Sequence, residues 1–413
     1  MSSTAITDIY QHNFEAIVAN RDLAIATPFT ALFLGQTPQI DFGANTVTIE
    51  LFKGNRKTAP LISRLAPGGG VDISQYTIRP GSAGVNDYLY SLISQDFEIP
   101  ASVCNKRVPT EPPFAGPSGT QAIRLLRRNY WLQEEATDAI RRILVRNERL
   151  AIQSFFDSEM DIGDTFQSNT KLVFPRNSNL KGRTVTTSWA TASSATPWDD
   201  YGDAQKAIKQ YSQVDGANLW YSFLSSDAIE NLKAIYRSQR EGLEQAPILQ
   251  YNDFNFNPDT AVPTMFQFLV SNGCEYQGWI RSSYSQSKIH LFTLPEGYDA
   301  SLTDSTETYT DFISGDTVAL GLYNPNYFKA YFGPGIKDPP EAAFYTANFP
   351  SVPALPASGP LTIGQSRIPA STMLLNLYPL GQNSGIGGVI EHAPIFAPIR
   401  PDVVATIATT TTA

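Results

Sequence analysis

The stretch that decides the fold is residues 118–156, SGTQAIRLLRRNYWLQEEATDAIRRILVRNERLAIQSFF, because it predicts one unusually long helix. Prolines precede it, and Ser118 is placed to cap its first turn. Its apolar residues recur at helical spacing and form one stripe: Ala136, Ile140, Ile143, Leu144, Leu150, Ala151 and Phe155. We expect a long amphipathic helix with that stripe against a core.

The remaining faces of this helix are basic. Seven arginines and no lysine stand among four acids in the segment. Asp138 and Arg142 are four residues apart, a spacing that allows an ion pair on a helix surface. These arginines form either a solvated face or a contact surface for another subunit, a role that suits the planar guanidinium group. The candidates for such contacts on this helix are Arg127, Arg128, Arg142 and Arg146.

A long segment rich in glycine and proline lies nearer the N-terminus, at residues 54–86. The run at 46–52 before it alternates apolar and polar residues and predicts a strand with one buried face. Long loops without their own core are uncommon in compact domains unless they serve an interface or a site. We expect a two-stranded excursion that reaches another subunit, with a disordered surface loop as the alternative. Its candidate contact residues are Lys53, Arg56, Lys57, Arg64 and Arg79.

The rest of the chain mixes predicted strands with predicted helices, which indicates an α+β fold. A short helix is expected at residues 3–20, a helix after Pro197, and another that begins at Ser225 or Ser226. The expected strands are 171–174 and 183–187 as a hairpin, 217–224, 266–270, 288–292, 317–322 and an extended stretch at 388–399. Prolines in the last of these favour an edge strand. We expect an inserted loop at 348–370 and a frayed tail at 409–412.

The composition indicates a large folded core with little charge on its surface. Of the 413 residues, 42% are apolar and 17% are charged, against about 25% charged in typical globular proteins. An obligate assembly would cover such a surface, and a β-rich monomer with a Thr/Ser surface is the alternative. The net charge of −9 and the pI near 5.0 argue against a protein that binds nucleic acid with its whole surface. They do not argue against a container that surrounds nucleic acid.

A search for catalytic or metal-binding patterns is negative. The triple glycine at 68–70 is not followed by Lys-Ser or Lys-Thr, and no serine lies in a Gly-x-Ser-x-Gly elbow. The histidines, His12, His290 and His392, are far apart, and His290 is expected to be packed in a strand. We therefore expect no enzyme activity, no catalytic residue, no cofactor and no metal site.

The chain gives no sign of secretion or of a membrane span. Its first twenty residues lack the pattern of a signal peptide, and no run of about 18 apolar residues occurs. Cys104 and Cys274 are too few for a disulfide framework and are expected to be reduced. We expect a protein made in a cytoplasm.

Three segments, in this order along the chain, resemble the major capsid protein family of tailed bacteriophages typified by the head protein of phage lambda. The first runs from the apolar Thr-Ala-Leu-Phe at 30–33 through the strand and basic loop to the arginine-rich helix. The second is Trp189 with Pro-Trp-Asp-Asp-Tyr at 197–201, a helix, the strand at 218–224 and Ser-Asp-Ala at 226–228. The third is the closing Ile-Glu-His-Ala-Pro-Ile at 390–395, followed by Arg-Pro-Asp at 400–402 and a last strand.

The resemblance implies the Hong Kong 97-type capsid fold, divided along the chain into five parts. These are an N-terminal arm and first peripheral segment at 1–45, an extended loop at 46–90, a peripheral domain at 91–199 with a spine helix at 118–157, an axial domain at 200–333, and an inserted loop with C-terminal peripheral strands at 334–413. Residues 245–262 and 335–370 have no counterpart in the family pattern.

The resemblance also implies function, partners and location. The expected function is a major capsid protein that assembles into the icosahedral head shell around the double-stranded DNA genome of a tailed phage. Implied partners are further copies in hexamers and pentamers, scaffolding, portal and decoration proteins, and packaged DNA bound without sequence specificity; no membrane is implied. The expected location is the virion, after assembly in the host cytoplasm. The alternatives are another virion protein, such as a tail component, and a soluble hydrolase.

Overall fold

The computed structural model describes the chain in stretches separated by gaps. These are residues 25–35, 39–40, 46–51, 84–90, 92–104, 106–108, 120–162, 171–212, 214, 219–243, 261–285, 287–299, 309–313, 315–333, 373–379 and 385–410.

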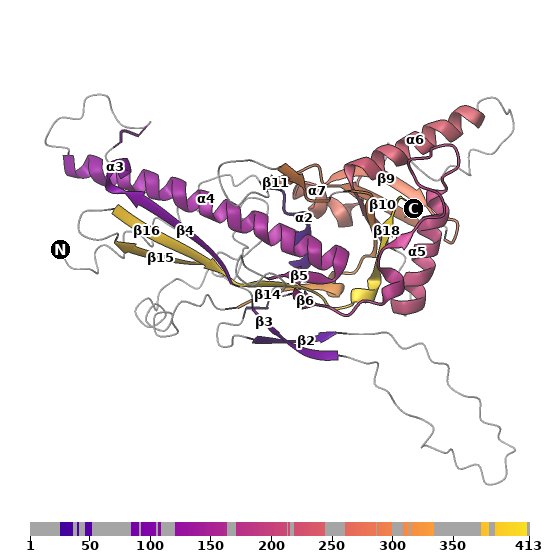
Figure 1. The fold of residues 1–413 in the computed structure, drawn as a ribbon, viewed down its shortest axis with the longest axis horizontal. Coiled ribbons are helices and arrows are strands. Elements are labelled where there is room, and N and C mark those ends of the chain that lie inside the picture. The colour runs from indigo at the N-terminus through magenta and orange to yellow at the C-terminus, as the bar shows by residue number, and fades with distance from the viewer. Residues whose placement is uncertain are drawn as a thin grey trace, which may run out of the picture.

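The long helix α4 (Thr120–Asp157) runs along the long axis and joins two ends of different architecture (Figure 1). At one end it packs on a three-stranded antiparallel sheet, in the order β15 (Met373–Pro379), β16 (Gly385–His392), β4 (Ile93–Pro100). The short helix α3 (Ala101–Cys104) follows β4 and contacts α4. At Gly388 in β16, an added Cβ would lie 2.2 Å from Cζ of Phe97, so the ring of β4 packs directly on the backbone of its neighbour.

The other end is built on a six-stranded mixed sheet. Its order is β7 (Arg183–Thr184), β18 (Val404–Ala408), β13 (Thr317–Leu322), β8 (Trp220–Leu224), β10 (Lys288–Thr293), β9 (Glu275–Arg281). Every residue of β8 is buried, as the apolar run at 217–224 predicts. The strands at 183–184 and 404–408 show that segments outside 200–333 complete this sheet.

Two helices accompany this sheet (Figure 1). Helix α5 (Pro197–Ser212) packs against β18 and β13, and α6 (Ser226–Leu243) follows β8. The Ser225 hydroxyl accepts a hydrogen bond from the N–H of Ala228 at 3.2 Å, so Ser225 is the residue that caps α6. The predicted cap and both predicted helices are confirmed.

A third sheet and a short helix fill the middle of the molecule. The sheet has the order β1 (Gln39–Ile40), β14 (Phe328–Phe332), β17 (Pro394–Pro398), and the helix is α2 (Pro28–Phe33). The extended stretch predicted at 388–399 is divided between two sheets. Its proline-flanked part, β17, lies at the edge as expected, but residues 388–392 lie in β16, the middle strand of its sheet, so the edge prediction is wrong for them. The core here is aromatic: the Phe29 ring lies 5.3 Å from that of Phe155 and 4.3 Å from that of Phe223.

The remaining elements are short ribbons and turns that attach to these three sheets. They are β2 (Thr46–Leu51) with β3 (Gly84–Leu89), β5 (Glu159–Asp161) with β6 (Lys171–Val173), β11 (Gly297–Asp299) with β12 (Tyr309–Asp311), η3 (Ser178–Leu180), η4 (Thr264–Phe266), α7 (Gln267–Ser271), η5 (Pro325–Tyr327) and η7 (Pro401–Val403).

Three further local predictions are wrong. The strands at 171–174 and 183–187 do not form a hairpin, because β6 pairs with β5 and β7 pairs with β18. Residues 266–270 lie in η4 and helix α7 rather than in a strand. Thr409 is fully buried rather than frayed, and its N–H donates to the carbonyl oxygen of Asp316 at 2.7 Å.

Other predictions are confirmed by the same elements. The long helix, the alternating strand at 46–52, the strands at 288–292 and 317–322 and the closing strand are present as α4, β2, β10, β13 and β18. The expected helix at 3–20 and the loop at 348–370 lie outside the described residues.

Candidate functional site: the long helix and its anchors

The long helix presents one face to the core and another to solvent. Leu132, Ala136, Ile140, Ile143 and Leu144 are all buried, and the stripe continues to Phe155. This face contacts α2, β5, β16, β17 and β18. The predicted stripe is therefore the contact between the helix and elements from both ends of the chain.

The exposed face carries a local ion pair. Arg142 Nη2 lies 2.9 Å from Asp138 Oδ2, and both side chains are at least half exposed, at 60% and 50%. This is the predicted pair at four-residue spacing. An exposed pair of this kind stabilises a helix by only about 0.3–0.5 kcal/mol. Arg141 beside it is also exposed, so this part of α4 remains accessible for contacts with other molecules.

Arg146 and Arg149, one turn later, make contacts within the subunit. Nη2 of Arg146 donates to the carbonyl oxygen of Asp161 at 3.2 Å, and the guanidinium of Arg149 lies 5.1 Å from the centre of the Tyr298 ring. Burial, together with the nearby Arg149, lowers the pKa of Arg146 from its usual value. Arg146 therefore anchors α4 to β5. Because its guanidinium group takes part in this internal contact, less of it is available to bind another subunit.

The other candidate contact residues are placed only in part. Arg127 is half-buried in the first half of α4, and Arg128 belongs to the same helix. The five candidates of the basic loop lie outside the described residues: Lys53, Arg56, Lys57, Arg64 and Arg79.

The two strands that flank this loop pair antiparallel, with Thr46 opposite Leu89 and Leu51 opposite Gly84. Exposed and buried residues alternate along β2, so one face of the ribbon packs on the body. The Tyr88 hydroxyl donates to the carbonyl oxygen of Val173 at 3.2 Å, and its ring lies 5.1 Å from that of Phe174. The ribbon is thus fixed near its Thr46–Leu89 end to β6 and to Phe174 after it.

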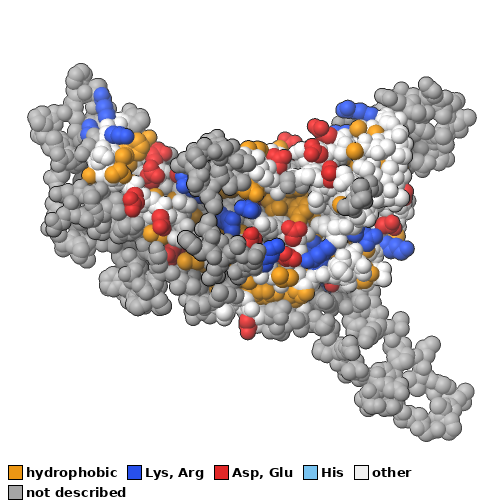
Figure 2. Space-filling view, viewed as in Figure 1, with side chains coloured by type: hydrophobic (Ala, Val, Ile, Leu, Met, Phe, Trp, Pro, Cys, Tyr) orange, Lys and Arg blue, Asp and Glu red, His pale blue; other side chains and the backbone are white. Residues whose placement is uncertain are grey.

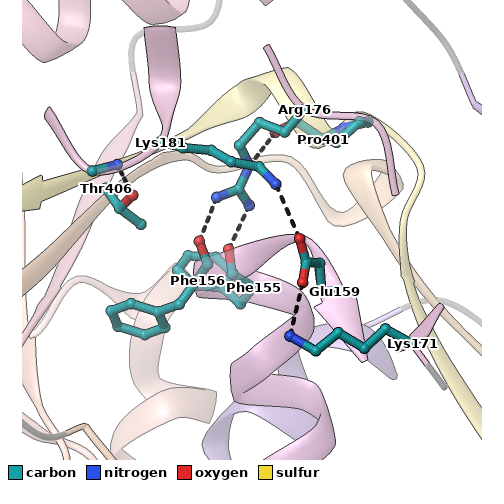
Figure 3. A network of polar contacts seen from close by, with 9 residues as sticks. Phe155, Phe156, Glu159, Lys171, Arg176, Lys181, Pro401 and Thr406 are labelled. Carbon is teal, nitrogen blue, oxygen red and sulfur yellow. Dashed lines mark hydrogen bonds and ion pairs between the residues drawn. The ribbon is translucent and has the colours of Figure 1, made fainter. Parts of the chain in front are cut away.

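The C-terminal end of α4 is held by a network that the sequence reasoning missed (Figure 3). Arg176 is only 7% exposed and donates to the carbonyl oxygens of Phe155, Phe156 and Pro401. Burial lowers its pKa to about 10, against the opposing effect of Asp157 and Asp402, so the guanidinium stays charged at neutral pH. Nothing in the local sequence distinguishes Arg176 from a surface arginine.

Further polar contacts tie the same region together. The N–H of Asn177 donates to Asp402 Oδ1 at 2.7 Å, and the Ser154 hydroxyl donates to the carbonyl oxygen of Phe396 at 2.6 Å. Glu159 lies between Lys171 and Lys181, at 3.4 and 3.5 Å (Figure 3). These polar contacts therefore join three parts of the chain: the end of α4, the segment after β6 and the C-terminal strands.

The described side chains on one face of the molecule carry charges of both signs. On the face shown in Figure 2, basic and acidic side chains are interspersed, with hydrophobic side chains between them. Such a mixed surface suits contacts between proteins better than the uniform basic face of a nucleic-acid-binding domain.

The described residues also place the groups considered for catalysis. His290 is packed in β10, and its Nδ1 lies 2.9 Å from the Tyr276 hydroxyl. Burial, together with Lys288, lowers the pKa of His290 to about 4, so the ring is neutral at pH 7. Asp199 and Asp200 lie in the first turn of α5, where Asp200 accepts a hydrogen bond from Trp189 Nε1 at 2.8 Å. Both acids therefore lie at the start of a helix.

The described part of the chain shows neither a metal-binding cluster nor a helix that could span a membrane. No group of three or more His, Cys, Asp or Glu side chains there is arranged to hold a metal ion. None of the helices there has the length and apolar character needed to cross a bilayer. Cys274 is buried and is not bonded to another cysteine.

Comparison with known protein families finds no matching family, and no curated protein sequence matches the chain. Solved structures do match. A crystal structure described as a capsid protein of a prophage of E. coli CFT073 has a TM-score of 0.55 at 13% identity, covering 96% of this chain and 98% of that one. A phage-related protein from Bordetella bronchiseptica RB50 has a TM-score of 0.43 at 12% identity, covering 94% of each chain. An encapsulin complex from Synechococcus elongatus PCC 7942 has a TM-score of 0.38 at 8% identity, covering 92% of this chain and 87% of that one.

The likeness to the prophage protein extends over almost the full length of both chains. It shows that the two share a fold, and it confirms the expected fold class, α+β of the Hong Kong 97 type. At 13% identity, a shared fold does not by itself carry over a role.

Proposed function

We propose that this chain is the major capsid protein of a tailed bacteriophage, a subunit of the shell that encloses the double-stranded DNA genome, and not an enzyme. The observation that carries the proposal is the end-to-end likeness to the prophage protein described as a capsid protein, with a TM-score of 0.55 over 96% of this chain. Such coverage leaves little of the chain for an unrelated domain.

The architecture supports the same role. The chain has a helix of 38 residues with one buried stripe and a ribbon, β2 with β3, whose strands are joined by a long glycine- and proline-rich segment. Its charged fraction is low, at 17%, and these features would leave a monomer with much uncovered surface. They are useful in a shell, where neighbouring copies cover the extended parts. When one surface of a subunit binds a different surface of the next copy, the copies can close into a ring.

In the arrangement we propose, copies form hexamers and pentamers through residues 200–333, together with the strands at 183–184 and 404–408 that complete the same sheet. The loop between β2 and β3 lies over α4 of the next copy, where its basic residues meet acids. The segments 1–45, 46–90 and 334–413 are then the arm, the extended loop and the last peripheral part. Scaffolding, portal and decoration proteins and packaged DNA complete the set of partners, and the mature location is the virion.

Particle size tests this function directly. The recombinant full chain, alone and with a candidate scaffolding protein, is passed over a size-exclusion column with light scattering. We expect ring-sized or shell-sized particles. A well-folded monomer under every condition would contradict the proposal.

A further inference from the structure

Two cations lie directly opposite each other at one end of the six-stranded sheet. Arg281 in β9 pairs with Lys288 in β10. The guanidinium carbon of Arg281 lies 5.2 Å from the centre of the Trp279 ring, and the ammonium nitrogen of Lys288 lies 4.6 Å from it. Like charges opposite each other on adjacent strands destabilise a sheet. The ring attracts both cations, but it does not neutralise their charge.

This cationic group, Trp279 with Arg281 and Lys288, lacks an anionic partner. Within the described residues, no acid forms an ion pair with either cation, and the buried Nε1 of Trp279 and Nε of Arg281 have no hydrogen-bond partner. Lys288 is exposed, while Trp279 and Arg281 are half-buried. Because β9 is the edge strand of the sheet, another molecule can reach the group and supply the missing negative charge.

Exposed acids lie at the opposite end of the same strands. Lys288 begins β10, and the next residue, Ile289, is level with Trp220 at the start of β8. Helix α6 begins after the end of β8, and Asp227 and Glu230 in its first two turns are exposed. No Lys or Arg of the described part of the chain forms an ion pair with either acid. The start of α6 is therefore an acidic surface without a cation of its own.

The cationic group and the acidic start of α6 do not meet within one subunit. Strand β8 has five residues, so its two ends are separated by about 16 Å at a rise of about 3.3 Å per residue. Contact between opposite ends of one sheet therefore takes two copies of the chain. Such a contact joins two different surfaces, so it repeats from copy to copy and can close into a ring.

Phosphate groups of a nucleic acid would also suit two cations beside an aromatic ring. The net charge of the chain is −9, which disfavours the approach of a polyanion and leaves an excess of acids for contacts between copies. The charges therefore favour a second copy of this chain as the partner.

We propose that the cationic group of one copy binds the acidic start of α6 in the next copy around a hexamer or pentamer. The inference rests on the proposed shell function, and it identifies two surfaces through which residues 200–333 meet. Arg281 and Lys288 then gain the carboxylates that their own subunit does not supply, which relieves the repulsion between them. Complementary charges also exclude wrong arrangements, so reversal of one side should block the contact.

Reversal of charge on each side tests the contact in the full chain. The double variant Arg281→Glu, Lys288→Glu sets acids against acids, so the yield of rings and shells from a size-exclusion column should fall roughly tenfold or more. Asp227→Lys, Glu230→Lys sets cations against cations and should cause a similar loss. Lys106→Glu, a reversal at an exposed residue outside 200–333, is the control and should assemble normally. Thermal unfolding of each variant shows whether the subunit stays folded.

The combination of the two double variants restores opposite charges across the contact. We expect it to recover most of the lost yield, which neither a folding defect nor a contact elsewhere would allow. If the half-buried Arg281→Glu prevents folding, the smaller exchange of Lys288→Glu with Asp227→Lys, both at exposed residues, makes the same test.

Undiminished assembly of either double variant, or a combined variant that assembles no better than the two, would overturn the proposal. Loss of assembly on reversal of the cations alone would assign them to nucleic acid or to another protein. An unmodified chain that never assembles contradicts the shell function itself, whereas an unmodified chain that assembles beside unaffected variants contradicts this contact alone.

Discussion

Arg176 caps the C-terminal end of the long helix by donating from Nη2 to the carbonyl oxygen of Phe155 at 2.5 Å. Its other two nitrogens donate to Phe156 at 2.6 Å and Pro401 at 3.0 Å. The last carbonyl groups of a helix have no partner within it, so a buried guanidinium is an effective substitute for one. Arg176 thereby joins α4 to η7, the turn that leads into the last strand.

We predict that Arg176→Ala lowers the free energy of unfolding by about 3–5 kcal/mol, because it leaves three buried carbonyl oxygens unpaired and removes the compensating charge near Asp157 and Asp402. Urea denaturation of the unassembled chain measures this loss. The matched control is Arg183→Ala, whose exposed guanidinium donates to one carbonyl oxygen, that of Asn179. It should change the same free energy by no more than about 0.5 kcal/mol. Equal losses in the two variants would show that Arg176 is not an anchor.

A second prediction concerns pH and His290. Because burial lowers the pKa of this ring to about 4, the unfolded chain binds the proton first as the solution is acidified. The contribution of His290 to stability is therefore fully present above pH 6.5 and is lost as the pH falls through about 4. The unfolding midpoint in urea, followed from pH 7 to pH 4, should fall more steeply in the unmodified protein than in His290→Gln.

The difference between these two profiles isolates His290, because every other titrating group is present in both proteins. Parallel profiles of the two proteins would show that the ring is not kept neutral by its position in β10.

A third prediction separates assembly from folding on α4. The double variant Arg141→Glu, Arg142→Glu changes two exposed residues, one of which forms an exposed ion pair. Its thermal unfolding should stay close to that of the unmodified subunit, since exposed pairs contribute about 0–1 kcal/mol. If this face meets a neighbouring copy, the yield of assembled particles should fall by tenfold or more.

Lys106→Glu, a reversal of charge at an exposed residue outside α4 and outside residues 200–333, serves as the control and should assemble normally. An undiminished yield of particles from the double variant would remove this face from the proposed contacts.

The fourth prediction concerns the loop between β2 and β3. Because Leu51 lies opposite Gly84, a short linker can close the ribbon after deletion of residues 55–82. The remaining ribbon keeps its anchor at Tyr88, so the subunit should fold with an unchanged circular dichroism spectrum. It should nevertheless fail to form closed shells. Well-formed shells from the shortened chain would show that the loop has no part in assembly.

Elements with a strong local pattern were predictable from the sequence. The apolar stripe of α4 repeats at helical spacing from Ala136 to Phe155, and the buried run of β8 is followed at once by the cap at Ser225. These signals depend on neighbours in the chain, which the sequence shows directly. The alternation along β2 predicted its buried face in the same way.

The errors arose where distant segments decide the local structure. Residues 266–270 are apolar and β-prone, but α7 ends at Ser271 and is followed by Gly273, whose φ of +105° suits a helix end rather than a strand. The strand at 183–184 pairs with one more than two hundred residues away, a partner that no local pattern specifies. A short apolar run alone does not distinguish a helix from a strand.

In the candidate site, too, features set by neighbours in the chain were predictable and features set by distant segments were not. The pair of Asp138 and Arg142 followed from spacing along one helix. The burial of Arg176 and Glu148 did not, because each is defined by backbone groups far away in the sequence, at Pro401 and at Phe29. A charged residue is buried where the fold brings such partners to it, and the sequence alone does not show where that happens.

Negative-stain electron microscopy of the recombinant full chain, with and without a candidate scaffolding protein, tests the central claim most directly. A shell subunit should give closed particles of uniform diameter, or rings of the size of a hexamer or pentamer. Open tubes would indicate a tail component instead, and a field of dispersed monomers under all conditions would contradict the role in a shell.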